Sequence, residues 1–192
     1  LLGSDTVEDH LARLEVVFQR LVAAGMKLSP EKSHFLRREV KFVGITLSSE
    51  GLRITEDRVK ALLDLKAPTS KKTLQSLLGF FGYNRRWIPN YAAITKPMYR
   101  LLSKNTPFNW TPECEQNLAT LKQAVANHVT LAVPDLMDKE QSYELVVDGS
   151  KHGMGAYLSQ KLNGKRRIIG YFSNSIPEHK REWGQTKIEL LT

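Results

Sequence analysis

The spacing of apolar residues predicts a helix and then a hairpin at the start of the chain. Apolar residues three or four positions apart favour a helix, and five of them recur in this way: Leu11, Leu14, Phe18, Leu21 and Val22. Thr6 suits the N-cap, with Asp9 at the capping-box position, and Gly25 suits the C-cap. A short helical turn is predicted with Pro30 at its first position. Residues 39–54 then predict two strands around a Ser-Glu-Gly turn.

The middle of the chain is helical in pattern. We predict four helices, at residues 55–65, 71–88, 90–104 and 111–127. Pro89 stops the second of them, and Pro97 is expected to break the third, because proline lacks the N–H that a helix interior needs. Thr111, Pro112 and Glu113 form the start signal of the fourth helix.

After Pro134 the pattern becomes that of strands. Three runs have strand character: Tyr143–Asp148, Met154–Leu162 and Arg166–Ser173. Asn163-Gly164, between the second and third runs, predicts a tight hairpin turn. A final helix is expected to begin near Glu178 or Arg181.

The three regions together predict the α/β fold class. We expect an α+β part at residues 1–54, a helical part at 55–107 and a mixed-sheet domain at 108–192. The chain starts and stops inside apolar patterns, at Leu1 and Leu2 and at Leu190 and Leu191, so we expect it to be a piece of a longer polypeptide.

Composition narrows the class of protein. The 192 residues are 41% hydrophobic, so a sizeable core can form, and no apolar run approaches the ~20 residues of a membrane helix. The single Cys114 supplies neither a disulfide framework nor a zinc site, which favours a reducing, intracellular location. The formal net charge of +8 favours a polyanionic partner over a membrane surface.

The predicted helix at residues 71–88 carries a candidate nucleic-acid surface. Gln75, Gly79 and Tyr83 lie four residues apart and therefore share one helix face. A polar residue, a glycine and an aromatic residue in a row form a shallow track. Such a track could lie along a nucleic-acid groove, with the backbone at Gly79 approaching it closely. The alternative is that Gly79 and Gly82, each costing roughly 1 kcal/mol relative to Ala, permit close packing of helices, with Tyr83 in the core.

Basic residues flank this track at both ends. Lys71 and Lys72 precede it, and Arg85 and Arg86 follow it. Lysine and arginine side chains in such places are suited to contact phosphates, which fix the position of a protein on a duplex without reading its sequence.

Two carboxylates form a candidate metal site. Asp148 ends a strand that reads as buried, and Glu189 lies on the final predicted helix. Clustered carboxylates hold the hard divalent cations used in phosphodiester hydrolysis. The alternative is that Asp148 only begins an Asp-Gly turn and that Glu189 is solvated. The five histidines show no paired spacing for a metal.

The order of these features resembles the reverse transcriptases of Ty3/gypsy-type retroelements along essentially the whole chain. Residues 10–35 resemble the last palm helix, 40–54 the primer grip, and 74–91 the thumb helix with its minor-groove track. Residues 108–125 resemble the linker helix, 145–160 the first hairpin of the RNase H domain, and 186–191 its first helix. The segment Asp-Gly-Ser departs mildly from the more usual Asp-Ala-Ser and leaves the aspartate in place.

The resemblance implies roles for particular residues. It assigns Phe42, Val43 and Gly44 to the primer grip and the track role to the stripe of the thumb helix. It assigns Asp148 and Glu189 to catalysis and to the binding of Mg²⁺ in the intact enzyme. The implied partners are the primer–template duplex, the RNA/DNA hybrid and the rest of the polyprotein, with no membrane.

The implied function is that of an RNA-directed DNA polymerase with ribonuclease H activity, in a cytoplasmic particle or the nucleus. The polymerase aspartates are expected before Leu1 and further RNase H carboxylates beyond Thr192, so that this chain alone catalyses little. A domesticated, non-catalytic nucleic-acid-binding module derived from a retroelement is the alternative. A third hypothesis is a protein-interaction domain, whose basic charge only keeps it solvated.

Overall fold

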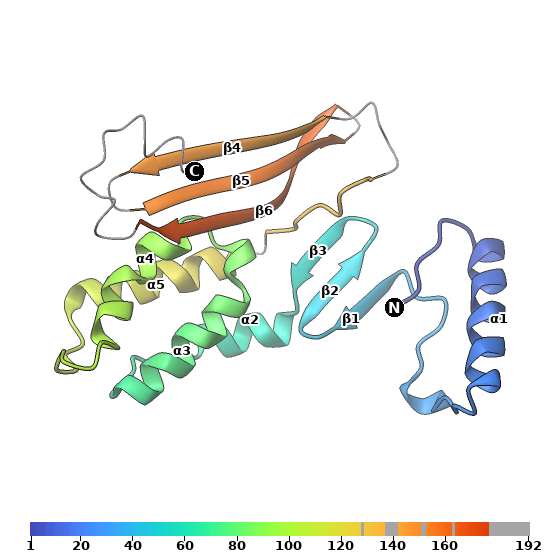
Figure 1. Cartoon of the computed structure of the whole chain (residues 1–192), viewed down its shortest axis with the longest axis horizontal. Coiled ribbons are helices and arrows are strands. Elements are labelled where there is room, and N and C mark those ends of the chain that lie inside the picture. Colours follow the sequence, from blue (N-terminus) through green and yellow to red (C-terminus); the bar gives the residue numbers. More distant parts are fainter. Residues whose placement is uncertain (128, 137–141, 151–152, 163, 177–192) are drawn as a thin grey trace. The chain divides into compact units, whose positions relative to one another are not determined.

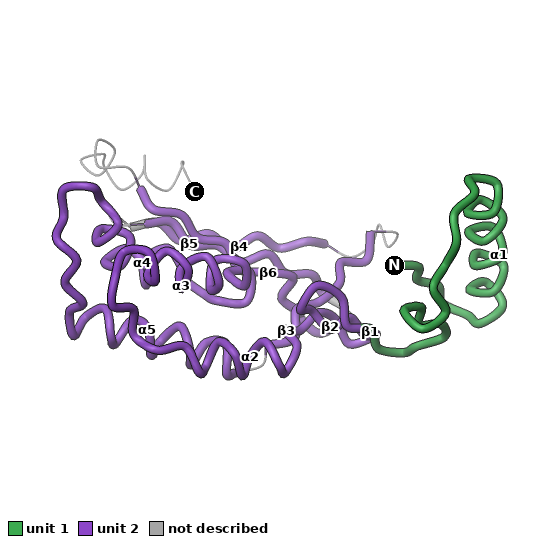
Figure 2. The backbone as a smooth tube through the Cα atoms, turned by 90° about the horizontal axis from the view of Figure 1, so that it is seen from below, with its two compact units in different colours: residues 1–40 green, residues 41–192 purple. Residues whose placement is uncertain are grey.

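The computed structural model describes residues 1–127, 129–136, 142–150, 153–162 and 164–176. Contacts group the chain into two compact units, residues 1–40 and residues 41–192 (Figure 2). Both helices and antiparallel sheets are present, which confirms the α/β class. The three-part division at residues 54 and 107 stays a prediction. Among the described residues, no helix is both long and apolar enough to span a bilayer.

The first unit holds helix α1, Val7–Ala23, and the 3-10 turn η1, Pro30–Lys32. The predicted N-cap of α1 is confirmed, because the Thr6 side chain accepts a hydrogen bond from the backbone N–H of Asp9. At the other end the C-cap is Ala24, and the predicted Gly25 follows it with a φ of 67° and an N–H that donates to the carbonyl of Val22. This left-handed conformation ends the helix and costs glycine little.

The predicted two-strand hairpin is wrong in one respect: three strands form. They are β1 (Glu39–Phe42), β2 (Ile45–Ser48) and β3 (Gly51–Ile54), in that order across the sheet. Val43 and Gly44 both have positive φ, 51° and 76°, and they form a two-residue turn that divides the expected first strand. The pattern missed this turn because a β-branched valine is rarely found at positive φ.

The helical body contains α2 (Glu56–Leu63), α3 (Lys71–Tyr83), the 3-10 turn η2 (Arg85–Trp87), α4 (Tyr91–Leu101) and α5 (Pro112–Ala126). Two predictions about it need correction. The helix expected to reach residue 88 ends at Tyr83, because the buried Asn84 turns its side chain back onto the carbonyl of Phe80. Pro97 lies inside α4 without ending it, since Met98 and Leu101 beyond it are buried in the core.

One core connects β3 with the helices. Its fully buried large side chains include Leu62 of α2, Leu74, Leu78 and Phe81 of α3, Met98 of α4, and Leu118 and Leu121 of α5. Leu131, beyond α5, joins the same core and forms an isolated antiparallel bridge with Leu52. The two backbone hydrogen bonds of this bridge are 2.7 and 2.8 Å long. The segment after α5 is thereby attached to the hairpin that precedes the helices.

The second sheet contains β4 (Tyr143–Ser150), β5 (Gly153–Leu162) and β6 (Lys165–Ser175), paired antiparallel in that order. The three predicted strands are present with longer ends, and Gly164 has the positive φ, 74°, that a tight turn requires. Strand β6 lies next to α4 (Figure 1). The backbone N–H of Ala92 in α4 donates to the hydroxyl of Ser173. The helix expected from residue 178 or 181 lies outside the described residues.

Candidate nucleic-acid interface

Helix α3 has two faces, as its sequence predicts. Leu74, Leu77, Leu78 and Phe81 are buried, whereas Gln75, Gly79 and Tyr83 are exposed. The side chain of Ser70 caps the start of the helix by accepting from the N–H of Thr73. The predicted exposed stripe is therefore present.

The glycines of α3 differ in what surrounds them. A Cβ added at Gly79 would meet no atom within 4 Å, so this glycine faces open space rather than another helix. At Gly82 the added Cβ would lie 3.3 Å from the hydroxyl oxygen of Tyr91, which donates to the carbonyl of Leu78. The packing alternative thus describes Gly82 and fails for Gly79, whose exposed backbone is free for close approach.

The turn between β1 and β2 presents apolar side chains to solvent. Phe42 is 52% exposed and Val43 is 59% exposed. A β-branched residue at positive φ is strained, and such strain persists only where surrounding contacts hold it. Here the backbone N–H of Thr55 donates to the carbonyl of Gly44 over 3.1 Å. The predicted grip residues therefore form a strained and exposed tip.

The structure brings this tip and the stripe of α3 together. The hydroxyl of Tyr83 donates to the carbonyl oxygen of Val43 over 3.0 Å, across a separation of 40 positions. Arg58 of α2 donates to the same oxygen over 3.1 Å. Sequence reasoning missed Arg58, because no local pattern indicates which distant backbone an arginine on a short helix reaches.

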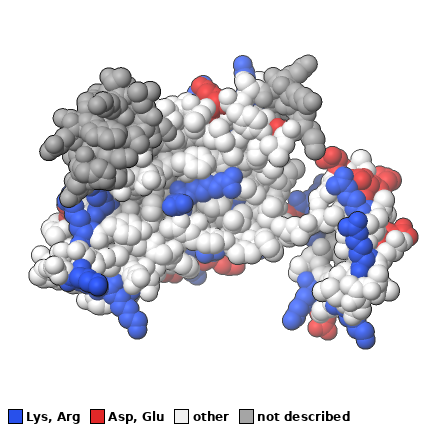
Figure 3. All heavy atoms as spheres, in the orientation of Figure 1, with Lys and Arg blue, Asp and Glu red and all other residues white. Residues whose placement is uncertain are grey.

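The predicted phosphate-contacting residues are in different surroundings. Arg85 is exposed, but Arg86 is half-buried, and its Nε donates to the carbonyl of Ile169 over 3.2 Å while its stem packs on Gly170. Lys71 donates to the carbonyls of Ser103 and Lys104, whereas Lys72 is exposed. Within the unit of residues 41–192, on the face shown in Figure 3, lysine and arginine side chains form separate groups rather than one continuous patch. Arg85 and Lys72, the two exposed residues, are therefore better placed to contact phosphates.

Asp148 lies on a polar row that crosses the second sheet. It is directly opposite Gly155 on β5, which is opposite Ser173 on β6, and opposite residues share a sheet face. A Cβ added at Gly155 would lie 2.9 Å from the side-chain oxygen of Asn90, so the start of α4 covers this row. Asp148 itself is exposed, as a metal ligand that meets a substrate needs to be.

The neighbouring row across this sheet is apolar. Val147 is opposite Ala156, and Ala156 is opposite Phe172. Val147 and Phe172 are exposed among the described residues, as is Leu145 on the same face. Successive residues of a strand point to opposite faces, so Asp148 and this apolar row lie on different sides of the sheet.

The metal site predicted at Asp148 is described only in part. Its second predicted ligand, Glu189, lies outside the described residues. Within the described part of the chain, no group of three or more His, Cys, Asp or Glu side chains could hold a metal ion. A carboxylate oxygen suits a hard divalent cation, so Asp148 fits such a site as one ligand among several.

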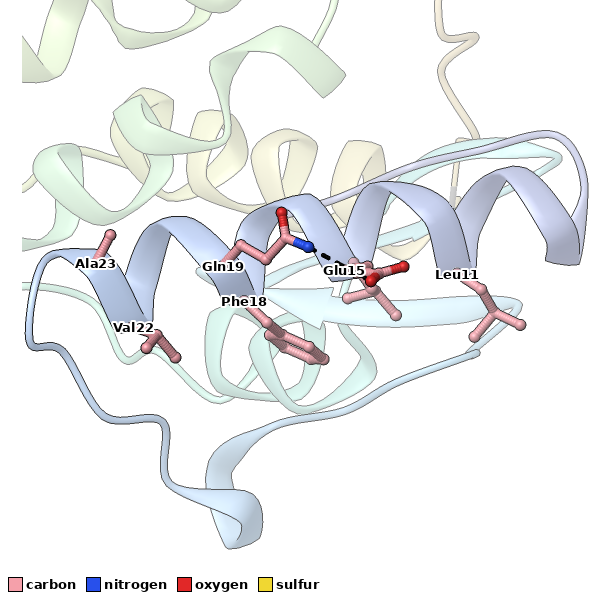
Figure 4. A pocket seen from close by; sticks show the side chains of 7 residues that line it. Leu11, Glu15, Phe18, Gln19, Val22 and Ala23 are labelled. Carbon is pink, nitrogen blue, oxygen red and sulfur yellow. Dashed lines mark hydrogen bonds between the residues drawn. The ribbon is translucent and has the colours of Figure 1, made fainter.

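Helix α1 of the first unit carries an apolar groove of about 560 Å³ (Figure 4). The side chains of Leu11, Phe18 and Val22 line it and point to one side, and Gln19 donates to Glu15 beside them. No residue of α1 is buried. The periodic apolar face predicted from the sequence is present and lies open in this unit.

The C-terminal sheet and α5 define the class of this part of the chain. Residues 110–192 match the model of the RNase H-like domain found in reverse transcriptase. The whole chain is 33% identical over 193 residues to the retrovirus-related Pol polyprotein from transposon 297 of Drosophila melanogaster, covering 100% of this chain and 18% of the relative. It is 28% identical to the transposon Tf2-3 polyprotein of Schizosaccharomyces pombe, covering 100% of this chain and 14% of that relative.

Two solved structures are also similar. The foamy viral protease-reverse transcriptase dRH in complex with ds DNA matches with a TM-score of 0.83 and 28% identity, over 100% of this chain and 33% of that one. The foamy viral protease-reverse transcriptase in complex with RNA/DNA hybrid matches with a TM-score of 0.82 and 28% identity, over 99% and 26%. The resemblance to retroelement reverse transcriptases is thereby confirmed. The chain spans about a fifth or less of the length of these polyprotein relatives.

Proposed function

We propose that this chain is part of an RNA-directed DNA polymerase with ribonuclease H activity, from a retroelement of the Ty3/gypsy type. In this proposal the chain holds the primer–template duplex and the RNA/DNA hybrid. Support comes from the relatives, which are named as Pol polyproteins, and from the similar foamy viral proteins, which were solved with ds DNA and RNA/DNA hybrid.

The unobstructed backbone at Gly79 is the observation that carries this proposal. A bare position on an exposed helix face lets the backbone approach a sugar–phosphate groove, and the amide of Gln75 has both donors and an acceptor for groove atoms. The tip formed by Phe42 and Val43 offers apolar contact to the sugar of the primer end. Two surfaces that suit a duplex are thus joined in one body.

For cleavage of RNA, we propose Asp148 and Glu189 as ligands of Mg²⁺, together with the further carboxylates that the resemblance implies. When bound, such an ion supplies an activated water and neutralises charge that develops on the phosphate. Asp148 contributes a solvent-exposed carboxylate at the β4 end of the polar row, whereas Asn90 and Ala92 at the start of α4 cover the row at Gly155 and Ser173.

Replacement of Gly79 by leucine tests the binding surface. The Gly79→Leu side chain would stand where the duplex backbone is expected, so the Kd for a hybrid should rise about tenfold, equivalent to ~1.4 kcal/mol. The fold should persist, since an added Cβ meets no atom within 4 Å. Fluorescence anisotropy with a labelled hybrid measures the Kd, and thermal unfolding checks the fold.

Ala119→Leu is the control, because it adds a leucine side chain at an exposed position of a different helix, α5. Its Kd should stay within about twofold of wild type, a difference below ~0.5 kcal/mol. Equal losses in the two variants would contradict a specific role for the Gly79 backbone. A non-catalytic module derived from a retroelement would give the same binding result, so only cleavage of RNA separates that alternative from the enzyme.

A further inference from the structure

A single carbonyl oxygen connects the tip of the hairpin to two helices. The carbonyl of Val43 accepts from the Tyr83 hydroxyl over 3.0 Å and from Nη1 of Arg58 over 3.1 Å. A carbonyl oxygen has two lone pairs, so both bonds can exist together. We call Arg58, Tyr83 and this carbonyl the clasp. It joins the turn at residues 43–44 to α2 and α3.

The guanidinium of Arg58 is directed into the fold rather than toward a phosphate. Its central carbon lies 4.1 Å from the centroid of the Tyr83 ring and 5.5 Å from that of Phe80. Its end packs directly against Gly44. Its Nε is buried and has no hydrogen-bond partner among the described residues. Cation–π contacts strengthen when they are desolvated. This arginine therefore stabilises the turn by packing between Gly44 and the Tyr83 ring.

The clasp also explains how a strained turn stays ordered. Val43 holds a φ of 51°, which a β-branched residue adopts only under constraint. The two donors meet its carbonyl and so fix the orientation of the peptide that follows. The exposed side chains of Phe42 and Val43 are thereby held at a defined place relative to Gly79.

We propose that Arg58 and Tyr83 are positioning residues, which make the primer-grip turn and the groove-facing stripe of α3 one rigid body. A duplex that ends in a primer 3′ terminus then contacts both surfaces at a fixed spacing. This inference rests on the proposed function, because it assumes that the turn meets the primer end. It adds a role for Arg58 and gives Tyr83 a role through its hydroxyl rather than through its ring.

The test compares two DNA probes on the full chain. One is a duplex with a recessed 3′ end, which engages both surfaces. The other is a closed dumbbell duplex of the same length, which has no terminus and engages the stripe alone. Anisotropy titrations give the ratio of the two Kd values. Wild type should prefer the recessed end, because both surfaces contribute there.

Two conservative variants remove the clasp without removing a ring or a charge. Tyr83→Phe deletes only the hydroxyl, and Arg58→Lys keeps the positive charge but loses the planar fork. Each should lower the preference for the recessed end by about three- to tenfold, the range expected for one or two hydrogen bonds. For Arg58→Lys, binding of the dumbbell should change by less than about twofold, since the stripe and the positive charge persist.

Tyr143→Phe is the matched control, because the hydroxyl of this similarly exposed tyrosine also donates to a backbone carbonyl, that of Asp135, over 3.1 Å. It should leave the preference unchanged, as should Arg166→Lys on β6. Clasp variants that keep the wild-type preference would overturn the inference, as would equal losses on both probes, which indicate only a damaged fold. A wild type without preference would also overturn it. A wild type that binds neither probe would instead refute the proposed function.

Discussion

At the scale of single residues, two turn glycines share a backbone conformation but differ in their neighbours. Gly44 and Gly164 have φ values of 76° and 74°. The guanidinium of Arg58 lies directly against Gly44, whereas a Cβ at Gly164 would meet no atom within 4 Å. Substituting alanine at both glycines therefore separates the free-energy cost of a side chain at positive φ from the cost of displacing a neighbouring side chain.

We expect Gly44→Ala to destabilise the fold more than Gly164→Ala. Both variants place a side chain at positive φ, which costs ~1–2 kcal/mol. Gly44→Ala also displaces Arg58 and breaks its bond to Val43, which adds ~1–2 kcal/mol. Urea unfolding of the two variants and wild type gives the three free energies. Equal losses would show that Arg58 shifts without cost and that the clasp contributes little.

At the scale of elements, local signals predicted most of the fold. The caps at Thr6 and Thr111 are read correctly because the capping bonds join residues three positions apart. The exposed stripe at Gln75 and Gly79 follows from helical periodicity alone. The end of α3 was missed, because it depends on the burial of Asn84, which no local pattern reveals.

The junction of α3 and α4 should weaken in alkaline solution. Tyr91 begins α4, is buried, and donates to the carbonyl of Leu78 in α3. Burial raises the pKa of its phenol well above the usual range, and the neighbouring Tyr99 raises it further, while Arg85 lowers it. Above pH ~10 the unfolded chain releases this proton first. The contribution of Tyr91 to the free energy of unfolding is therefore constant below pH ~10 and falls as the pH rises beyond it.

Tyr91→Phe should flatten that alkaline decline, although it lowers stability near neutral pH by ~1 kcal/mol through the lost hydrogen bond. Urea unfolding from pH 8 to 11.5 measures the slope. Tyr143→Phe serves as the control, because it also removes a tyrosine hydroxyl that donates to a backbone carbonyl, but at an exposed position. An unchanged slope in Tyr91→Phe would assign the decline to other groups.

At the scale of the whole molecule, a candidate catalytic carboxylate and a candidate binding surface lie on separate elements. Asp148 belongs to β4, whereas the stripe and the tip belong to α3 and the first hairpin. The sequence indicated Asp148 as unusual, since a carboxylate ends an apolar run. It did not indicate that Asn90 of the helical body would reach Gly155, opposite Asp148, because that contact joins segments far apart in the chain.

We expect binding and cleavage to separate in a polypeptide that carries this chain within a complete RNase H-like domain. Asp148→Asn should abolish cleavage of the RNA strand, because an amide is a poorer ligand for a hard cation than a carboxylate. Hybrid binding should stay within about twofold, since phosphate contacts elsewhere persist. Gel analysis of labelled RNA and anisotropy measure the two properties. Asp64→Asn removes the same charge from the end of α2 and should cleave normally. Full cleavage by Asp148→Asn would leave Asp148 as a turn residue.

The bridge between Leu52 and Leu131 has a consequence for synthesis on the ribosome. Strand β3 completes its hydrogen bonds only when Leu131 arrives, and the roughly 80 residues between them take on the order of 4–16 s to translate at ~5–20 residues per second. During that interval the edge at Leu52 has unsatisfied backbone groups, which invite pairing with another nascent chain. Formation of the bridge also requires glycine at position 51, because the carbonyl of Leu131 packs where the side chain of any other residue would lie. The helices between these two residues must therefore form and fold back before the hairpin is protected.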